Sequence, residues 1–197
     1  MQAAEVRWQQ VVIRNLSVPG WRSADLLLAL QTDSAMRGAV TESNVVTWDI
    51  GGNDLSGARA RYLEGSCGGS DNQQCLRDAV EQFRSNWDSI ISELLALRST
   101  QNTIFRTMNI YNPYVEIDIA TGDFAVLEPF LQQVNDHIQT TAAANGILVG
   151  DVHSAFNGES RQEQPTALLA FDQFHPNDAG HETIASELRA LGYSPLN

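Results

Sequence analysis

The chain has 197 residues, of which 43% are hydrophobic, and this is enough to bury the core of one domain. We therefore expect residues 1–197 to form a single domain. The formal net charge of −12 argues against a nucleic-acid partner, because a phosphate backbone requires clustered Lys and Arg. No apolar run in the sequence approaches the roughly 18 residues of a membrane span. We therefore expect neither nucleic-acid binding nor a membrane-spanning segment.

Short apolar segments alternate along the chain with longer segments whose apolar residues recur at helical spacing. The predicted strands are residues 11–13, 44–50, 103–110 and 147–152. The predicted helices are residues 24–30, 76–97, 126–144 and 176–191, and Ser23 is the predicted N-cap of the first. This alternation indicates a three-layer α/β/α fold with a mostly parallel sheet. In such sheets, functional sites form at the carboxyl ends of the strands.

The two cysteines, Cys67 and Cys75, lie in a stretch rich in Gly, Ser, Asn and Gln that can bring them within bonding range. A disulfide between them would indicate an oxidising compartment and hence a secreted or periplasmic protein. Two free thiols in a surface loop are the alternative. A zinc site would need further Cys or His partners at short spacing, and none lies nearby in the sequence, so we predict no metal. Residues 1–5 lack the basic and apolar regions of a signal peptide.

A carboxylate and an imidazole lie three residues apart, at Asp172 and His175, just before the last predicted helix. At this spacing the carboxylate can accept the Nδ1 hydrogen of the imidazole, which leaves Nε2 free to act as a base. Most such pairs are solvated surface residues or local caps, so the pair alone is weak evidence. The Gly-Gly-Asn-Asp turn at residues 51–54 is equally weak alone. The prediction of function depends on the combination of these segments and on their order.

In that combination and order, the sequence resembles the SGNH (GDSL-type) hydrolase family. The glycine of the family's N-x-x-x-x-G turn corresponds to Gly20, at the end of residues 15–20. The G-x-N-D block corresponds to residues 51–54, and the D-x-x-H-P block corresponds to residues 172–176. The resemblance covers essentially the whole chain. It implies a flavodoxin-like sheet and the hydrolysis of small esters, with short acyl or acetyl groups, without a cofactor.

The resemblance also assigns roles to individual residues. His175 would be the general base, and Asp172 would orient it. The backbone N–H of Gly20 and the side-chain amide of Asn53 would donate to the oxyanion of the tetrahedral intermediate. The alternative for Asn53 is a turn residue that bonds within its own loop. The other histidines are expected at the surface or in packing roles, and they are His137, His153 and His181.

The family's G-D-S block carries the nucleophilic serine, yet residues 1–14 contain no serine. We therefore expect the block and the first strand to be missing, so that the domain is truncated at its N-terminus relative to the family. Three explanations compete: a truncated product without catalysis, a substitute serine, or a partner chain that supplies the element. Ser17 is the best substitute, because it ends its predicted strand three residues before Gly20. The alternative is that Ser17 is an ordinary turn residue.

Loss of a central strand would leave the predicted strand at residues 11–13 without a neighbour, and unpaired apolar strands associate readily. Either this strand moves to pair with the strand at residues 44–50, or two chains complete each other by swapping. We therefore expect a homo-oligomer, most simply a dimer. Two functions remain open, an esterase and a non-catalytic α/β domain that binds or assembles. Hydrolysis of a chromogenic acetate ester that His175→Ala abolishes would separate them.

Overall fold

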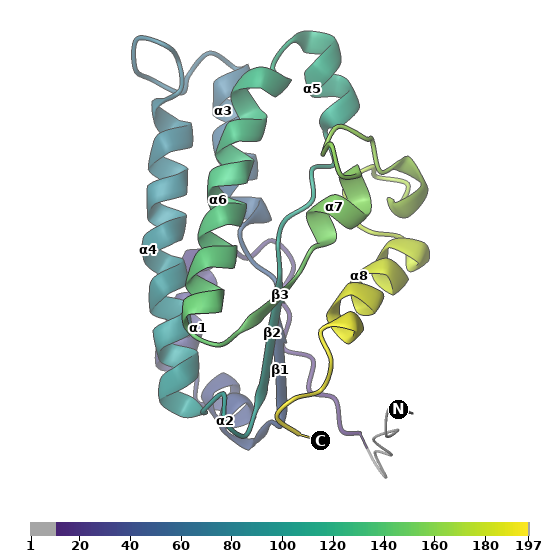
Figure 1. Ribbon diagram of the computed structural model, residues 1–197. Coiled ribbons are helices and arrows are strands. Elements are labelled where there is room, and N and C mark those ends of the chain that lie inside the picture. Colours follow the sequence, from purple (N-terminus) through teal and green to yellow (C-terminus); the bar gives the residue numbers. More distant parts are fainter. Residues whose placement is uncertain (1–10, 197) are drawn as a thin grey trace.

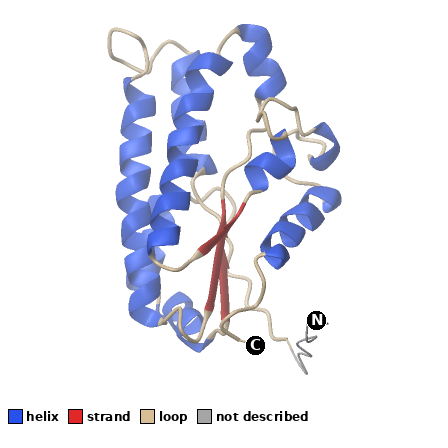
Figure 2. Cartoon of the chain, in the orientation of Figure 1, coloured by secondary structure: helices blue, strands red, loops and turns tan. Residues whose placement is uncertain are grey.

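The computed structural model describes residues 11–196 (Figure 1). The chain start at residues 1–5, whose sequence lacks the features of a signal peptide, lies outside the described residues. Within the described residues, the sheet has three parallel strands, drawn in red in Figure 2. They are β1 (Val45–Trp48), β2 (Ile104–Met108) and β3 (Leu148–Gly150), in the order β1-β2-β3. The register places Val45 opposite Ile104 and Arg106 opposite Leu148. Three of the four predicted strands are therefore confirmed.

Helices cover both faces of this sheet, which makes the fold a three-layer α/β/α arrangement (Figure 1). One face carries α1 (Ser23–Thr32), α2 (Ser34–Glu42), α3 (Gly52–Leu63), α4 (Gln74–Leu97) and α6 (Phe124–Ala144), with α5 (Val115–Thr121) beside α6. The other face carries α7 (Val152–Asn157), the short 3-10 turn Thr166–Leu168 and α8 (Asp178–Ala190). None of the described helices combines the length and apolar composition needed to cross a membrane.

The main core lies between the sheet and α4, whose apolar residues recur at helical spacing as the sequence predicted. Trp87 is fully buried, with its ring 5.6 Å from that of Phe83 and 5.9 Å from that of Trp48. Trp48 in turn meets Phe105 of β2 edge to face. Strand β2 is buried at every position, as expected for the middle strand of a sheet covered on both faces.

Residues 11–13 do not form a strand, so that prediction is wrong. Val11, Val12 and Ile13 are 66%, 75% and 83% exposed. Of the two alternatives for this segment, the direct pairing with the strand at residues 44–50 is wrong, because β1 pairs with β2 alone in the described part of the chain. A strand requires a neighbour for its backbone groups, and β-branched composition does not supply one.

The helix cap predicted at Ser23 is likewise wrong. Arg22 occupies the N-cap of α1, and the carboxylate of Asp25 accepts its backbone N–H at 2.9 Å. Ser23 is fully buried, and its hydroxyl donates to Asp54 in α3 rather than to its own helix. The serine therefore joins two helices.

Candidate active site

Asp172 and His175 are held together in one tight loop before α8. Nδ1 of His175 lies 2.6 Å from Oδ2 of Asp172. The other carboxylate oxygen accepts the backbone N–H groups of Phe174 and His175, each at 3.0 Å. The hydrogen bond from the His175 ring, followed by those from the two backbone groups, lowers the pKa of Asp172 to about 2. The carboxylate is thus ionised and directs the imidazole.

The loop that carries this pair is closed by its own backbone. The N–H of Ala170 donates to the carbonyl of His175 at 2.7 Å, and the N–H of Asn177 donates to the carbonyl of Leu168 at 2.9 Å. The hydroxyl of Tyr111, which follows β2, donates to the carbonyl of Phe174 at 2.7 Å. The loop is therefore anchored to the carboxyl end of the sheet, where a parallel sheet forms its sites.

The two predicted oxyanion donors lie on the turn before α1 and in the first turn of α3, and these two segments contact each other. Gly20 has a φ of +83°, a conformation that favours glycine, and a Cβ at this position would meet no atom within 4 Å. The side-chain amide of Asn53 donates to the carbonyl of Trp21 at 3.0 Å. One amide hydrogen of Asn53 is used by this bond, and the other is available to a ligand.

A buried triplet that the sequence analysis did not recognise fixes these two turns relative to each other. The Asp54 carboxylate accepts the backbone N–H of Ser23 at 2.9 Å and also its hydroxyl hydrogen. The side-chain amide of Asn86 in α4 donates to the Ser23 hydroxyl at 2.9 Å. Burial raises the pKa of Asp54, and the hydrogen bonds from Ser23 oppose this rise. The triplet positions the Gly20 turn above α3.

These turns and the histidine border one cavity of about 820 Å³. Ser17, Gly20, Asn53 and His175 all line it. Its walls are largely apolar and aromatic, and they include Trp21, Ile110, Tyr111, Tyr114, Phe130 and Phe174. A cavity of this kind, with a few convergent polar groups, is typical of a small-molecule site.

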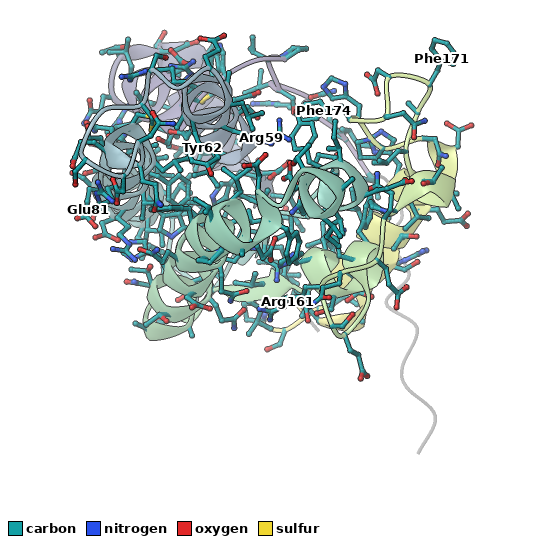
Figure 3. The ribbon with its side chains drawn as sticks, turned by 90° about the horizontal axis from the view of Figure 1, so that it is seen from above. Arg59, Tyr62, Glu81, Arg161, Phe171 and Phe174 are labelled. Atoms are coloured by element: carbon teal, nitrogen blue, oxygen red, sulfur yellow. A yellow bond between two sulfur atoms is a disulfide. The ribbon has the colours of Figure 1, made fainter. Side chains whose placement is uncertain are left out.

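Arg59 lines the cavity, and an aspartate balances its positive charge. The guanidinium of Arg59 stacks on Tyr114, 3.9 Å from the ring centroid, and forms an ion pair with Asp118. Seen from above, Arg59 and Phe174 lie next to each other at the rim of the cavity (Figure 3). The ring of Tyr114 lies 5.8 Å from that of Phe174, so the three side chains form one continuous wall.

Ser17 lies on the cavity wall, but its hydroxyl makes no hydrogen bond to His175 among the described residues. Its backbone N–H donates to the side chain of Asn15 at 3.0 Å, which forms a local Asx turn. The structure therefore brings Ser17 to the same cavity as His175 without joining the two side chains.

The remaining histidines have different surroundings. His137 on α6 pairs with Asp88 on α4 at 2.8 Å, and His181 lines the cavity. His153 is fully buried, and burial lowers its pKa to about 4, so it is neutral. Its Nε2 lies 3.4 Å from Glu128. Within residues 11–196, no group of three His, Cys, Asp or Glu side chains is arranged to hold a metal ion.

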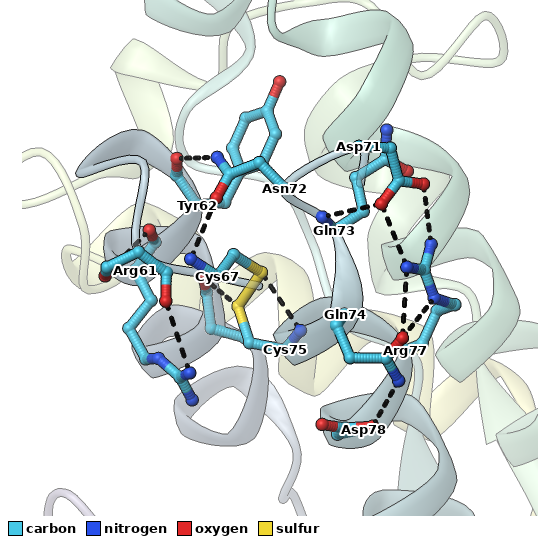
Figure 4. Close-up of a disulfide and its surroundings, with 12 residues drawn as sticks. Arg61, Tyr62, Cys67, Asp71, Asn72, Gln73, Gln74, Cys75, Arg77 and Asp78 are labelled. Carbon is cyan, nitrogen blue, oxygen red and sulfur yellow. Dashed lines mark hydrogen bonds and ion pairs between the residues drawn. A yellow bond between two sulfur atoms is a disulfide. The ribbon is translucent and has the colours of Figure 1, made fainter. Parts of the chain in front are cut away.

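Cys67 and Cys75 form a disulfide that closes the loop between α3 and α4 (Figure 4). The backbone N–H of Cys75 donates to the carbonyl of Cys67 at 2.9 Å. The side chain of Asn72 accepts the N–H of Cys67 at 2.9 Å and donates to the carbonyl of Tyr62 at 2.8 Å. The disulfide is compatible with an extracellular or periplasmic location.

Comparison with known proteins agrees with this geometry. The model of the GDSL-like Lipase/Acylhydrolase family matches residues 2–183. The chain belongs to this family. A spore germination lipase, LipC of Bacillus licheniformis, is 23% identical over 172 residues, which cover 86% of this chain and 73% of the lipase.

Two solved structures share the fold of this family member. The lipase Lip_vut3 from a goat rumen metagenome aligns with a TM-score of 0.71 and 21% identity, covering 89% of this chain and 76% of that one. Axe2, an acetylxylan esterase from Geobacillus stearothermophilus, aligns with a TM-score of 0.59 and 18% identity, covering 87% of this chain and 67% of that one. At these identities the alignments establish the common α/β/α fold.

Proposed function

We propose that this family member hydrolyses esters of short acyl groups, including acetyl esters. The observation that carries the proposal is the Asp172–His175 hydrogen bond of 2.6 Å beside a cavity that also contains Gly20 and Asn53. A relative named as an acetylxylan esterase supports the acetyl group as a candidate, and the relatives named as lipases support ester hydrolysis more broadly.

In this mechanism the Asp172 carboxylate accepts the Nδ1 hydrogen of His175 and holds the ring in one tautomer. Nε2 then takes the proton of the attacking hydroxyl and returns it to the leaving alcohol, which leaves the acyl group on the nucleophile. Nε2 next takes a proton from water, whose attack releases the carboxylic acid as the proton returns to the nucleophile's oxygen. The carbonyl oxygen becomes an oxyanion, which accepts hydrogens from the Gly20 backbone and the Asn53 amide. Each such donor contributes about 3–4 kcal/mol of transition-state stabilisation. The pair of donors and the base face one cavity, as acyl transfer requires.

Ser17 is our candidate for the nucleophile among the residues that line the cavity. An activated serine needs its Oγ within hydrogen-bond reach of the base, roughly 2.6–3.2 Å, and apo structures are often looser. Ser17 does not make that bond here, so the proposal requires the segment around residues 14–20 to move toward His175 when substrate binds. Ser17→Ala should then abolish ester hydrolysis while leaving the fold intact, because Ser17 is exposed.

The alternative function is a domain that binds esters or related ligands in the same cavity without cleaving them. The unbonded hydroxyl of Ser17 favours this alternative. A steady-state assay with a series of p-nitrophenyl esters, from acetate to octanoate, separates the two functions. We expect turnover that falls as the acyl chain lengthens, and loss of turnover in His175→Ala.

His137→Ala is the matched control, because His137 also pairs with an aspartate but lies away from the cavity. It should leave turnover unchanged. Labelling with a serine-directed phosphonate, followed by peptide mass spectrometry, should mark Ser17. Turnover that His175→Ala does not affect would overturn the hydrolase proposal, and a label on another serine would eliminate Ser17.

A further inference from the structure

The segment between β2 and α5 has no regular structure, and side-chain amides bind its backbone instead. It runs between α6 and α7 (Figure 1). Asn135 of α6 accepts the backbone N–H of Ile110 at 2.8 Å and donates to the carbonyl of the same residue at 2.9 Å. Asn157 of α7 does the same for Asn112, with both hydrogen bonds at 2.8 Å. The backbone is therefore fixed on either side of Tyr111.

The contacts of Asn135 also determine which ring nitrogen of the buried His153 carries hydrogen. Oδ1 of Asn135 accepts from Ile110, so its amide nitrogen is the atom that lies 3.2 Å from Nδ1 of His153. An amide nitrogen only donates, so Nδ1 accepts, and the hydrogen of the neutral ring lies on Nε2. Nε2 lies 3.4 Å from Oε1 of Glu128. Both atoms are buried, and neither has another hydrogen-bond partner in the described part of the chain.

Glu128 completes this network on the other side of Tyr111. Its second carboxylate oxygen accepts the side-chain amide of Asn112 at 2.9 Å. The carboxylate therefore faces one donor with each oxygen, Nε2 of His153 and the amide of Asn112. We call these side chains, Asn112, Glu128, Asn135 and His153, the buried clamp. A buried polar network keeps its geometry only while each member has its partner, so the loss of one acceptor disturbs the whole clamp.

Tyr111 connects the clamped segment to the loop of the proposed base. Its ring stacks on Phe156 of α7, with the ring centroids 4.5 Å apart. Its hydroxyl donates to the carbonyl of Phe174 at 2.7 Å, and Phe174 directly precedes His175 in the chain. Because Asp172 and His175 are bonded within one loop, the tyrosine hydroxyl holds the pair as a unit against the carboxyl end of the sheet.

We propose that Tyr111 is a positioning residue for His175, and that the buried clamp acts through Tyr111. The inference rests on the proposed function, because it gives Glu128 and His153 a role in ester hydrolysis although neither lines the cavity. A displacement of about 1 Å in a reacting group can lower a rate by about 10²-fold, so the placement of the loop affects turnover.

Tyr111→Phe tests the first part of the inference, because it keeps the ring and removes only the hydroxyl. In steady-state hydrolysis of p-nitrophenyl acetate, kcat should fall roughly 10-fold, which is the effect of one lost hydrogen bond, while KM stays unchanged. Tyr62→Phe is the matched control, since the Tyr62 hydroxyl bonds Asp123 at 3.2 Å and does not line the cavity. It should leave kcat unchanged. An unchanged kcat in Tyr111→Phe would overturn the proposal.

A double-mutant cycle tests whether the clamp acts through Tyr111. Glu128→Gln leaves one acceptor where the clamp needs two, so kcat should fall by a similar factor. The double variant Tyr111→Phe/Glu128→Gln should be no slower than the slower single variant, because both changes remove the same contact. Losses that multiply would overturn the role of the clamp. Circular dichroism checks that each variant is folded, and Tyr111→Phe leaves the clamp itself intact if Glu128→Gln does not fold.

Hydrogen exchange separates a failure of this inference from a failure of the proposed function, because it requires no turnover. The backbone N–H groups of Ala170 and Asn177 close the loop that carries His175. Both should exchange roughly 10-fold faster in Tyr111→Phe and in Glu128→Gln, and at the native rate in Tyr62→Phe. In a chain without esterase turnover, faster exchange would still support the link between Tyr111 and this loop. Exchange at the native rate in Tyr111→Phe would overturn it.

Discussion

The carboxylate of Asp172 is bound on both oxygens by its own loop, so the residue that we propose orients the base depends little on the rest of the molecule. One oxygen accepts from the His175 ring, and the other accepts from two successive backbone N–H groups. Both side chains remain substantially exposed, at 50% for Asp172 and 67% for His175. Substitutions here therefore report on chemistry with little effect on folding.

Asp172→Asn keeps the shape of the side chain but removes its charge. In the proposed mechanism, the amide no longer stabilises the imidazolium or selects the tautomer, so kcat for acetate ester hydrolysis should fall roughly 10²- to 10⁴-fold. Asp178→Asn, at the start of α8 and outside the cavity lining, serves as the control. An unchanged kcat in Asp172→Asn would show that His175 does not act through this carboxylate.

Asp49 provides a test of electrostatics in the cavity. It lines the cavity at the end of β1, where partial burial raises its pKa from 3.8 to about 6 although the residue keeps contact with solvent. A raised carboxyl pKa means that the native state loses stability as pH rises from about 4 through 6. Asp49→Asn should remove this loss of stability. We expect the free energy of unfolding at pH 7.5 to rise by about 1 kcal/mol, which is less than the full pKa shift would give because solvent screens the carboxylate.

Urea denaturation of both proteins at pH 4.5, 6 and 7.5 measures this effect. The advantage of Asp49→Asn over the native chain should grow with pH. A constant difference between the two proteins across this range would contradict the raised pKa.

At the scale of elements, the junction between β1 and α3 depends on one glycine. Gly51 has a φ of +123°, and a Cβ there would lie 2.7 Å from the Phe83 ring and 2.8 Å from Ile110. Gly51→Ala should therefore destabilise the protein by roughly 1–3 kcal/mol through strain and overlap. Gly52, the first residue of α3, does not have a positive φ. A Cβ added to Gly52 would lie 4.0 Å from its nearest neighbouring atom, on Ile110.

Gly52→Ala is consequently an adjacent control for that prediction. It should leave stability unchanged or raise it by about 0.4–1 kcal/mol, because alanine has less freedom in the unfolded chain. Thermal unfolding followed by circular dichroism separates the two variants. Equal effects of the two substitutions would contradict the assigned backbone conformation.

The disulfide constrains the start of α4, the longest helix of the described chain. Replacing both Cys67 and Cys75 by alanine should lower the unfolding free energy by roughly 2–3 kcal/mol, since closure of a short loop restricts the unfolded chain. Urea denaturation with and without reductant provides the measurement. Reductant should destabilise the native chain and leave the double variant unaffected. Two reactive thiols in the unfolded native chain without reductant would show that the bond does not form.

Elements that supply their own hydrogen bonds were the most predictable. The periodicity from residue 76 to 97 predicts a helix, and α4 spans Gln74–Leu97. Residues 11–13 have strand composition, but a strand requires a partner that this segment does not find. Helix α3 was not predicted, because its two glycines weaken the helical pattern. Its packing against α4 compensates for that weakness.

At the scale of the whole molecule, the sequence predicted local parts of the site but not their connections. Asp172 and His175 are three residues apart, so spacing alone suggests their contact. Ser23 contacts Asp54, which is 31 residues away in the sequence, and Asn86, which is 63 residues away. A local sequence pattern cannot predict contacts between residues so far apart in the chain. The family resemblance placed Gly20 and Asn53 at one site without identifying the buried contacts that hold them there.

The strand order of the sheet also has a consequence for biosynthesis. Because β1, β2 and β3 lie side by side in the order in which they are made, each strand can dock on its predecessor as the nascent chain emerges. Strands β1 and β2, with α3 and α4 between them, are complete before residue 110. The loop carrying Asp172 and His175 is synthesised only after all three strands. The strands are therefore made before the loop that carries His175, and α8, which covers one face of the sheet, follows that loop.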